Sequence, residues 1–476
     1  MLDLHPIDYS IILGYFILIL IVGFFAKRKI HNLNDYFLAG RRLTLPIFVA
    51  TLVSTWYGGL LGVGELSYNY GAVNWLTQGF FWYIIYLFFA LFLANRIRKS
   101  NLTTIPDQLE KFYKDKKTRF LGAIFNFLMV TPASYLLSIG FIFTLLFDWP
   151  LWIGVLIGTL IMIFYTLRSG FIGVIYTDFI QFVLMMAGVA LIIPFAVQNY
   201  GGWEFLTTNL PSLHLDITGG WSTQMILVWG FLAFWTLVDP GFYQRCYAAK
   251  DTKIPRKGIL ISIGFWLLFD ICTTFTGLYA RAAAEAGLLS VSSPTTAYLD
   301  IAISVLPIGI LGIFLTGLIA TVMSTIDSFT FLGAMNISHD IYKHVFRPNA
   351  TDKQVMNMTK IGIVLTALFA GTLALYFDSI VAMWYTIGTI GISALIVPVL
   401  GGFFYPGRKS AKAALSSIIL GAAVSLSWMI FGYLNLDSWG WPQYPLAIEP
   451  LYPGMLISLL AFLLVSLLDS KTMEGK

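Results

Sequence analysis

The chain contains a series of apolar stretches, each long enough to cross a lipid bilayer as a helix. A crossing needs about 20 mostly apolar residues, because lipid offers the backbone no hydrogen-bond partners and the helix must satisfy its own polar groups. Such stretches lie near residues 8–26, 44–66, 74–95, 120–147, 150–167, 171–198, 222–244, 258–280, 303–338, 357–377, 379–405, 413–434 and 451–468. We therefore expect an all-α polytopic membrane protein with about 13 transmembrane helices. The stretches 120–147 and 303–338 are long enough to contain a further break, which would change this number by one.

The composition agrees with a membrane protein. Of the 476 residues, 58% are hydrophobic and 11% are charged, whereas a soluble domain has about 45–50% apolar and about 25% charged residues. Too few charges remain to cover a water-facing surface, which excludes a soluble enzyme, a disordered chain and, despite the net charge of +5, a nucleic-acid binder. Two cysteines support neither a disulfide framework nor a cysteine-based metal site. No stretch between the spans exceeds about 25 residues, so residues 1–476 read as a single membrane domain.

Basic residues are distributed asymmetrically between the two sides of the membrane. If the N-terminus is outside, the positive-inside rule places all of the 29 Lys and Arg residues except Arg281 on the cytoplasmic side. We therefore expect a multi-pass protein of a plasma membrane, most simply a bacterial inner membrane, with the N-terminus outside and the C-terminus in the cytoplasm. No Lys or Arg precedes the span 8–26, which is expected to be a retained helix and not a signal peptide.

Two spans carry residues that interrupt a helix. The span 44–66 contains Gly58 and Gly59, and the span 222–244 runs into Asp239-Pro240-Gly241. Proline removes a helix donor and glycine weakens the helix, so both spans are expected to be locally unwound. Taken singly, each interruption is explained by an ordinary kink. As a pair in corresponding positions, they are typical of a transporter binding site.

Each interrupted span opens a unit of five helices. We expect a first repeat over 44–200 and an inverted second repeat over 222–405. An extra helix at 8–26 precedes them, and two extra helices at 413–468 follow. Five is an odd number, so the second unit enters the membrane from the opposite side.

Polar side chains gather on one face of the span 303–338. At 100° per residue, Thr321, Ser324, Thr325, Asp327 and Ser328 share an arc of about 160°; we call this set the hydroxyl stripe. Hydroxyl and carboxylate oxygens are hard ligands, which suit an alkali or alkaline-earth cation better than a transition metal. The alternative, that Ser and Thr bond back to their own helix and aid packing, accounts for one or two of them.

Other intramembrane carboxylates are less informative. Glu65, Asp178, Asp239 and Asp270 fall inside apolar spans, where a charge costs at least about 2.5–3.5 kcal/mol. Asp178 either faces a cation or bonds to a neighbouring helix, and both interpretations stay open. Glu65 reads as interfacial, and Asp270 has no evident partner. No phosphate-binding loop appears, which argues against an ATP-driven pump.

Several strings in the chain are similar to those of the sodium:solute symporter family. They are DYFLAGRR at 35–42, YTD at 176–178, QRCYAAKD at 244–251, MSTIDS at 323–328 and DIY at 340–342. The resemblance covers nearly the whole length and implies a LeuT-like fold of two inverted five-helix repeats. It also implies Na⁺ bound by the carbonyls of Leu52, Thr55 and Thr321 and the hydroxyls of Ser324 and Thr325. Some members bind a second Na⁺, which would use Asp178, Asp327 and Ser328 here.

The resemblance also indicates where a solute binds. The corresponding substrate positions are Ser54, Trp56, Gly59, Gln78, Thr131, Trp235 and Asp239. Thr131 stands about where the sialic acid branch carries an arginine, which argues against a bulky anionic substrate. Asp239 is compatible with a cationic ligand, but some sugar-branch members carry Asp there too.

These observations predict a sodium-coupled symporter and not an enzyme. Na⁺, bound between the broken span and the hydroxyl stripe, would drive import of a small polar organic solute such as a sugar or amino acid by alternating access. The expected partners are that solute and the lipid bilayer, with no nucleic acid and no obligatory protein partner. The alternatives are a Na⁺-regulated uniporter or channel, or a transporter-like sensor, on the same fold.

Overall fold

The computed structural model describes residues 4–26, 31–437 and 442–474. Within these ranges the named elements are all helical, and two isolated bridges, Leu43 with Ala249 and Leu436 with Pro442, are the extended pairings. The basic residues Lys27, Arg28, Lys29 and Lys476, which contribute to the expected orientation, lie outside the described residues.

The elements follow the predicted spans closely. They are α1 Pro6–Ala26, α2 Leu33–Leu38, η2 Ala39–Arg41, α3 Leu45–Trp56, α4 Leu60–Tyr70, η3 Trp75–Phe80, α5 Phe81–Phe88, η4 Phe89–Leu93, α6 Ala94–Ser100, α7 Ile105–Tyr113, α8 Lys116–Met129, α9 Ala133–Phe147, α10 Leu151–Tyr200, α11 Trp203–Asn209, α12 Thr223–Leu232, η5 Ala233–Val238, α13 Pro240–Ala248, α14 Lys253–Glu285, α15 Ala297–Val305, α16 Ile310–Met335, η6 Asn336–Phe346, α17 Asp352–Ala374, α18 Ile380–Phe404, α19 Ala411–Leu434, η7 Pro445–Ala447 and α20 Leu451–Glu474.

The described residues contain 10 helices long and apolar enough to span a membrane, or up to 11 if the bent pair α3 and α4 counts as one span. Shorter apolar helices, Pro6–Val22 and Leu151–Phe164, occupy the first and fifth predicted spans. The all-helical membrane architecture is therefore confirmed, whereas the number of 13 crossings stays a prediction.

Both predicted interruptions are present. The axes of α3 and α4 differ by 54°, and Tyr57, Gly58 and Gly59 lie between the two helices. In the other span, α12 tightens into the 3₁₀ segment η5, Asp239 leaves the helical region, and α13 starts at Pro240. The long stretch 120–147 also contains a break, between α8 and α9, and α10 is kinked at Gly170, where φ is 55°.

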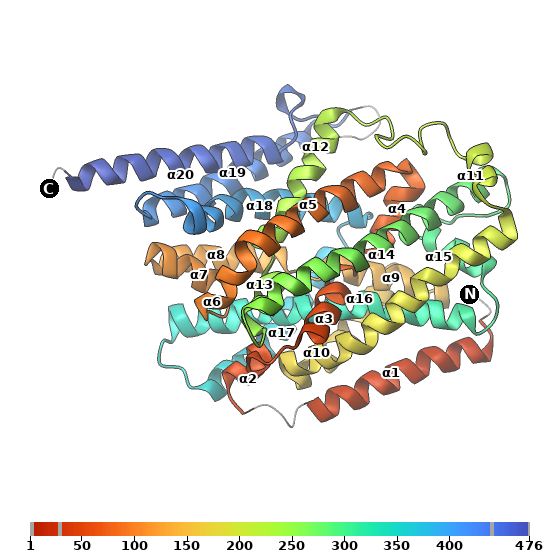
Figure 1. The fold of residues 1–476 in the computed structure, drawn as a ribbon, viewed down its shortest axis with the longest axis horizontal. Helices are drawn as coiled ribbons and strands as arrows, with labels where there is room; N and C mark the ends of the chain where they lie inside the picture. Colours follow the sequence, from red (N-terminus) through yellow and green to blue (C-terminus); the bar gives the residue numbers. More distant parts are fainter. Residues whose placement is uncertain (1–3, 27–30, 438–441, 475–476) are drawn as a thin grey trace.

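The helix α16 is the central element of the bundle. Almost all of its side chains are buried, and it packs along α10, α17, α1 and α3. The helices α18, α19 and α20 pack together at one side. Figure 1 shows α6 and α7 toward one end of the molecule and α11 and α15 toward the other. The helix α7 begins with a capping box between Thr104 and Asp107.

Candidate functional site

The hydroxyl stripe of α16 lies directly against the last turn of α3. The Ser324 hydroxyl donates to the carbonyl of Ser54 at 2.8 Å and lies 3.0 Å from the carbonyl of Thr321. The Thr325 hydroxyl lies 2.8 Å from the carbonyl of Thr55, 3.3 Å from that of Thr321 and 3.5 Å from that of Ser54. Two hydroxyl and three carbonyl oxygens therefore face one another where α3 ends.

This cluster contains hard oxygen ligands only. An end of a helix leaves carbonyls without intrahelical donors, and such carbonyls coordinate alkali cations in discontinuous membrane helices. The residues present therefore fit a sodium ion. Of the five sodium ligands inferred from the resemblance, Thr55, Thr321, Ser324 and Thr325 meet here. Among the described contacts, the hydroxyls reach the carbonyl of Ser54 and not that of Leu52, which lies earlier on α3.

Glycine allows the two helices to approach this closely. A Cβ atom at Gly58 would lie 2.1 Å from Oγ1 and 2.5 Å from Cβ of Thr325, and one at Gly59 would lie 2.1 Å from the ring of Trp384. The break between α3 and α4 is thus the point where the backbone touches α16 on one side and α18 on the other.

A buried arginine lies among the residues proposed for a second sodium. Nη2 of Arg245 lies 2.6 Å from the Thr55 hydroxyl, 2.8 Å from the Ser328 hydroxyl and 3.5 Å from Oδ2 of Asp178. Oδ1 of Asp327, the third residue proposed for that ion, accepts from the Thr166 hydroxyl at 3.3 Å. The positive-inside rule counts Arg245 among the basic residues on the cytoplasmic side without indicating its burial. In the structure it is fully buried within α13, where buried Asp178 supplies a countercharge.

A small cavity of about 90 Å³ lies beside the α3–α4 break. Most of its lining is aromatic. It includes six tryptophans, namely Trp56, Trp82, Trp229, Trp235, Trp266 and Trp384. Four of the expected substrate positions line it: Trp56, Gly59, Gln78 and Trp235.

The other three expected substrate positions do not line this cavity. The carbonyl of Ser54 belongs to the sodium cluster. Thr131 is buried in the break between α8 and α9. The carboxylate of Asp239 caps α13, where Oδ1 accepts from the backbone N–H of Phe242 at 2.8 Å. The cap explains one oxygen of this aspartate, whereas Oδ2 is buried without a hydrogen-bond partner in the described structure.

Asp270 also lines the cavity, although the sequence analysis assigned it no partner and no role. It lies on α14, is 4% exposed, and accepts hydrogen bonds from the hydroxyls of Tyr57 and Tyr83. Its position inside an apolar span was visible in the sequence. Its partners were not, because they come from two other spans.

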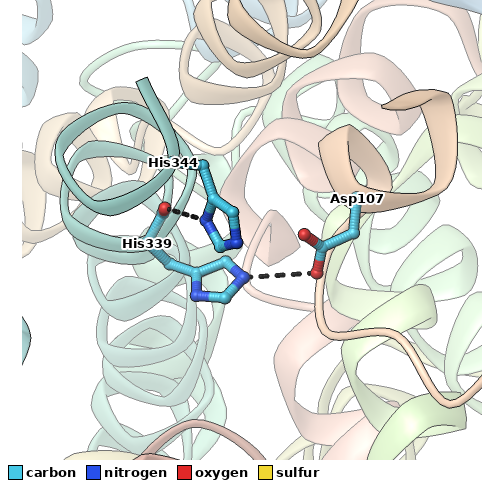
Figure 2. Close-up of side chains that lie close together, drawn as sticks. All are labelled: Asp107, His339 and His344. Carbon is cyan, nitrogen blue, oxygen red and sulfur yellow. Dashed lines mark hydrogen bonds and ion pairs between the residues drawn. The ribbon is translucent and has the colours of Figure 1, made fainter. Parts of the chain in front are cut away.

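A second polar cluster lies beyond the C-terminal end of α16. Asp107 on α7 and His339 and His344 on η6 place one ligand atom each within 4.8 Å of one another, and Figure 2 shows the three side chains turned together. Nε2 of His339 lies 3.2 Å from Oδ2 of Asp107. That oxygen also accepts the backbone N–H groups of Thr103 and Thr104.

The guanidinium of Arg119 pairs with the other oxygen of Asp107 and lies 3.0 Å from Asp340. Burial raises the pKa of Asp107, but His339 and Arg119 lower it more, so the net shift is downward. The cluster links α7 to η6. It is a poor metal site, because the nearby guanidinium of Arg119 disfavours a further positive charge.

Comparisons with known proteins give a consistent result. A family model described as the sodium:solute symporter family matches residues 36–421. The osmoregulated proline transporter OpuE of Bacillus subtilis (strain 168) is 27% identical over 98% of this chain and 96% of its own length. The high-affinity choline transporter 1 of Drosophila melanogaster is 26% identical over 88% of this chain and 70% of its own.

A solved structure has the same fold. It is a substrate-bound, outward-open state of a Na⁺-coupled sialic acid symporter, which superposes with a TM-score of 0.81 over 98% of each chain at 19% identity.

Proposed function

This chain belongs to the sodium:solute symporter family, and from that premise we propose that it imports a small polar organic solute together with Na⁺. It is a multi-pass membrane protein of a transporter family and not an enzyme. Na⁺ entering from outside binds between the end of α3 and the hydroxyl stripe, solute binds in the neighbouring cavity, and rocking of one helix bundle exposes both to the cytoplasm.

The observation that carries the proposal is the oxygen cluster between two helices that are distant in sequence. Ser324 and Thr325 come from α16, whereas the carbonyls of Ser54 and Thr55 come from the end of α3. A cation bound there is held by both helices at once and stabilises the arrangement in which they touch. This is how an ion raises the affinity of the adjacent cavity for its solute.

The wider arrangement follows from the same proposal. Residues 44–200 and 222–405 form the two inverted repeats, with 8–26 before them and 413–468 after. The N-terminus is outside and the C-terminus is in the cytoplasm, in a plasma membrane that is most simply a bacterial inner membrane. The two broken segments start the two repeats, as expected of this class of transporter.

We further propose that one Na⁺ is transported per cycle. A second Na⁺ at Asp178 and Ser328 would have to share its ligands with the guanidinium of Arg245. Two cations in one buried site repel each other strongly. Arg245 therefore serves as a tethered cation in place of a second sodium ion.

Thermal unfolding of the purified protein in detergent, titrated with NaCl or KCl, tests the sodium site. An ion that binds the native state raises the midpoint in proportion to RT ln(1 + [Na⁺]/Kd). We expect a rise with NaCl only, lost in Ser324→Ala. Ser262→Ala is the matched control, since this buried hydroxyl on α14 donates to the carbonyl of Gly258 in its own helix. Equal unfolding midpoints in NaCl and KCl would refute sodium coupling through this site.

A further inference from the structure

The cavity beside the α3–α4 break is an aromatic cage. Rings from eight helical segments line it, among them Trp56, Trp82, Tyr86, Trp266 and Trp384. Several of these rings already contact one another; those of Tyr86 and Trp266, for example, have centroids 4.3 Å apart. The faces of aromatic rings carry partial negative charge, and they attract an organic cation by about 0.5–2 kcal/mol per contact.

The charge of the lining residues also favours a cationic ligand. Within the described chain, Asp270 is the one charged residue that lines the cavity, and no Lys, Arg or His lines it. The described ion pairs do not include Asp270. Its two oxygens are held by the phenols of Tyr57 and Tyr83, which keep it in place without neutralising it. A carboxylate buried in a membrane protein requires a countercharge or a proton, and here a ligand can bring the countercharge.

A buried hydrogen-bond donor also lines the cavity. Nε2 of Gln78 is buried at the cavity wall and has no hydrogen-bond partner in the described structure. An amide nitrogen can only donate, so it seeks an acceptor oxygen. Leaving it unpaired costs about 1–3 kcal/mol. The cavity therefore offers a carboxylate and aromatic faces for a cation, and a donor for a hydroxyl or carboxylate oxygen.

We propose that the transported solute is a small organic molecule with an alkylated ammonium group and an acceptor oxygen, held by Asp270, the aromatic cage and Gln78. A volume of about 90 Å³ is several times what one water molecule needs and suits a compact solute. Alkylated ammonium groups are the characteristic ligands of aromatic cages, because they carry charge but few hydrogen-bond donors. This inference rests on the proposed symport function and narrows its substrate class.

The central comparison of the test is between two ligands of the same shape, of which only one carries a charge. Thermal unfolding of the full-length protein in detergent is measured with choline, glycine betaine and proline, and with 3,3-dimethylbutan-1-ol, which has the shape of choline without its charge. Glucose serves as a neutral polar solute. Each is titrated in NaCl and in KCl. We expect at least one of the three ammonium compounds to raise the midpoint, more in NaCl than in KCl, and the two neutral compounds to leave it unchanged.

Asp270→Asn removes the charge and keeps the shape. Removing one partner of a buried charge pair weakens binding, so the affinity for the ammonium compound should fall by at least about tenfold, while the sodium-induced rise persists. Glu65→Gln is the matched control. Glu65 is also a buried carboxylate held by two hydroxyls, those of Ser379 and Thr295, but it does not line the cavity.

Each outcome separates the two proposals. A sodium-induced rise without any response to ammonium compounds, or an equal response to 3,3-dimethylbutan-1-ol and choline, overturns the substrate class and leaves sodium coupling standing. Asp270→Asn with unchanged ammonium affinity also overturns it. An ammonium response that Asp270→Asn abolishes, with no difference between NaCl and KCl, upholds the substrate class and overturns sodium coupling.

Discussion

Substituting Gly58 by alanine should separate the two helices that form the sodium site. The added Cβ would lie 2.5 Å from Cβ and 3.0 Å from Cγ2 of Thr325. Carbon atoms pack at about 3.5–4.0 Å, so the end of α3 and α16 must move apart by about 1 Å. The contacts of 2.8 Å from Ser324 to the Ser54 carbonyl and from Thr325 to the Thr55 carbonyl would then exceed hydrogen-bond range.

Two effects follow, and they have different magnitudes. Overpacking of this kind costs about 1–3 kcal/mol of folding stability in any salt. In addition, a cation can no longer reach both helices. If its Kd rises tenfold, the stabilisation by Na⁺ falls from about 2.7 to about 1.4 kcal/mol at a concentration of 100 times the original Kd. We expect a loss at least this large.

The assay is the midpoint of thermal unfolding, followed by tryptophan fluorescence in detergent, across a NaCl titration with KCl as reference. Gly264→Ala is the control, because a Cβ at Gly264 on α14 meets nothing within 4 Å. Alanine there should be neutral or slightly stabilising. The reasoning is refuted if Gly58→Ala binds Na⁺ with the affinity of the wild type, or if Gly264→Ala weakens Na⁺ binding equally.

Three further perturbations test other parts of the structure. Arg245→Gln should lower stability by about 3–5 kcal/mol because it leaves Asp178 as an unpaired buried charge, and adding Asp178→Asn should restore part of the loss in a double-mutant cycle of chemical unfolding. Gly59→Ala should weaken solute binding more than Na⁺ binding, since its Cβ would lie 2.1 Å from the Trp384 ring; Gly14→Ala, with open space around it, is the control in both titrations. The lowered pKa of Asp107 means that its carboxylate stabilises the fold above its unfolded pKa of about 4 and that this contribution is lost as the pH falls below that value. Acid should therefore destabilise the wild type more than Asp107→Asn in unfolding measured between about pH 5 and about pH 2.

Features encoded locally in the sequence were predictable. Gly58-Gly59 and Asp239-Pro240 identified both breaks because glycine and proline act on the helix that contains them. The hydroxyl stripe followed from helical periodicity alone. Its partner carbonyls at the end of α3 required the family resemblance, since no periodic signal connects Ser324 with a residue 270 positions away.

Features made by tertiary contact were not predictable. Arg245 looked like one of several basic residues after a span, and its burial depends on Asp178, which is 67 positions earlier. The buried position of Asp270 is explained by the hydrogen bonds that it accepts from Tyr57 and Tyr83, which come from other parts of the chain. A buried charge is explained by its partner, and a single sequence does not state which span provides that partner.

The short segment 55–59 joins the two sites physically. Its residues are divided between them: Thr55 and Gly58 contact α16, whereas Trp56, Tyr57 and Gly59 line the aromatic cavity. Because this segment is not helical between Trp56 and Leu60, its conformation depends on what holds it from each side. We expect an ion that fixes the Thr55 carbonyl to restrict the Tyr57 phenol as well, and with it Asp270.

Linkage then requires that a solute bound at Asp270 tightens Na⁺ binding by the same factor by which Na⁺ tightens solute binding. A segment of five residues that bears on both sites can carry such a coupling. If Na⁺ and solute bind independently in Tyr57→Phe, which loses the phenol that reaches Asp270, but cooperatively in the wild type, the coupling runs through this segment. If cooperativity is unchanged in that variant, the coupling depends on the movement of whole helices and not on the link from Tyr57 to Asp270.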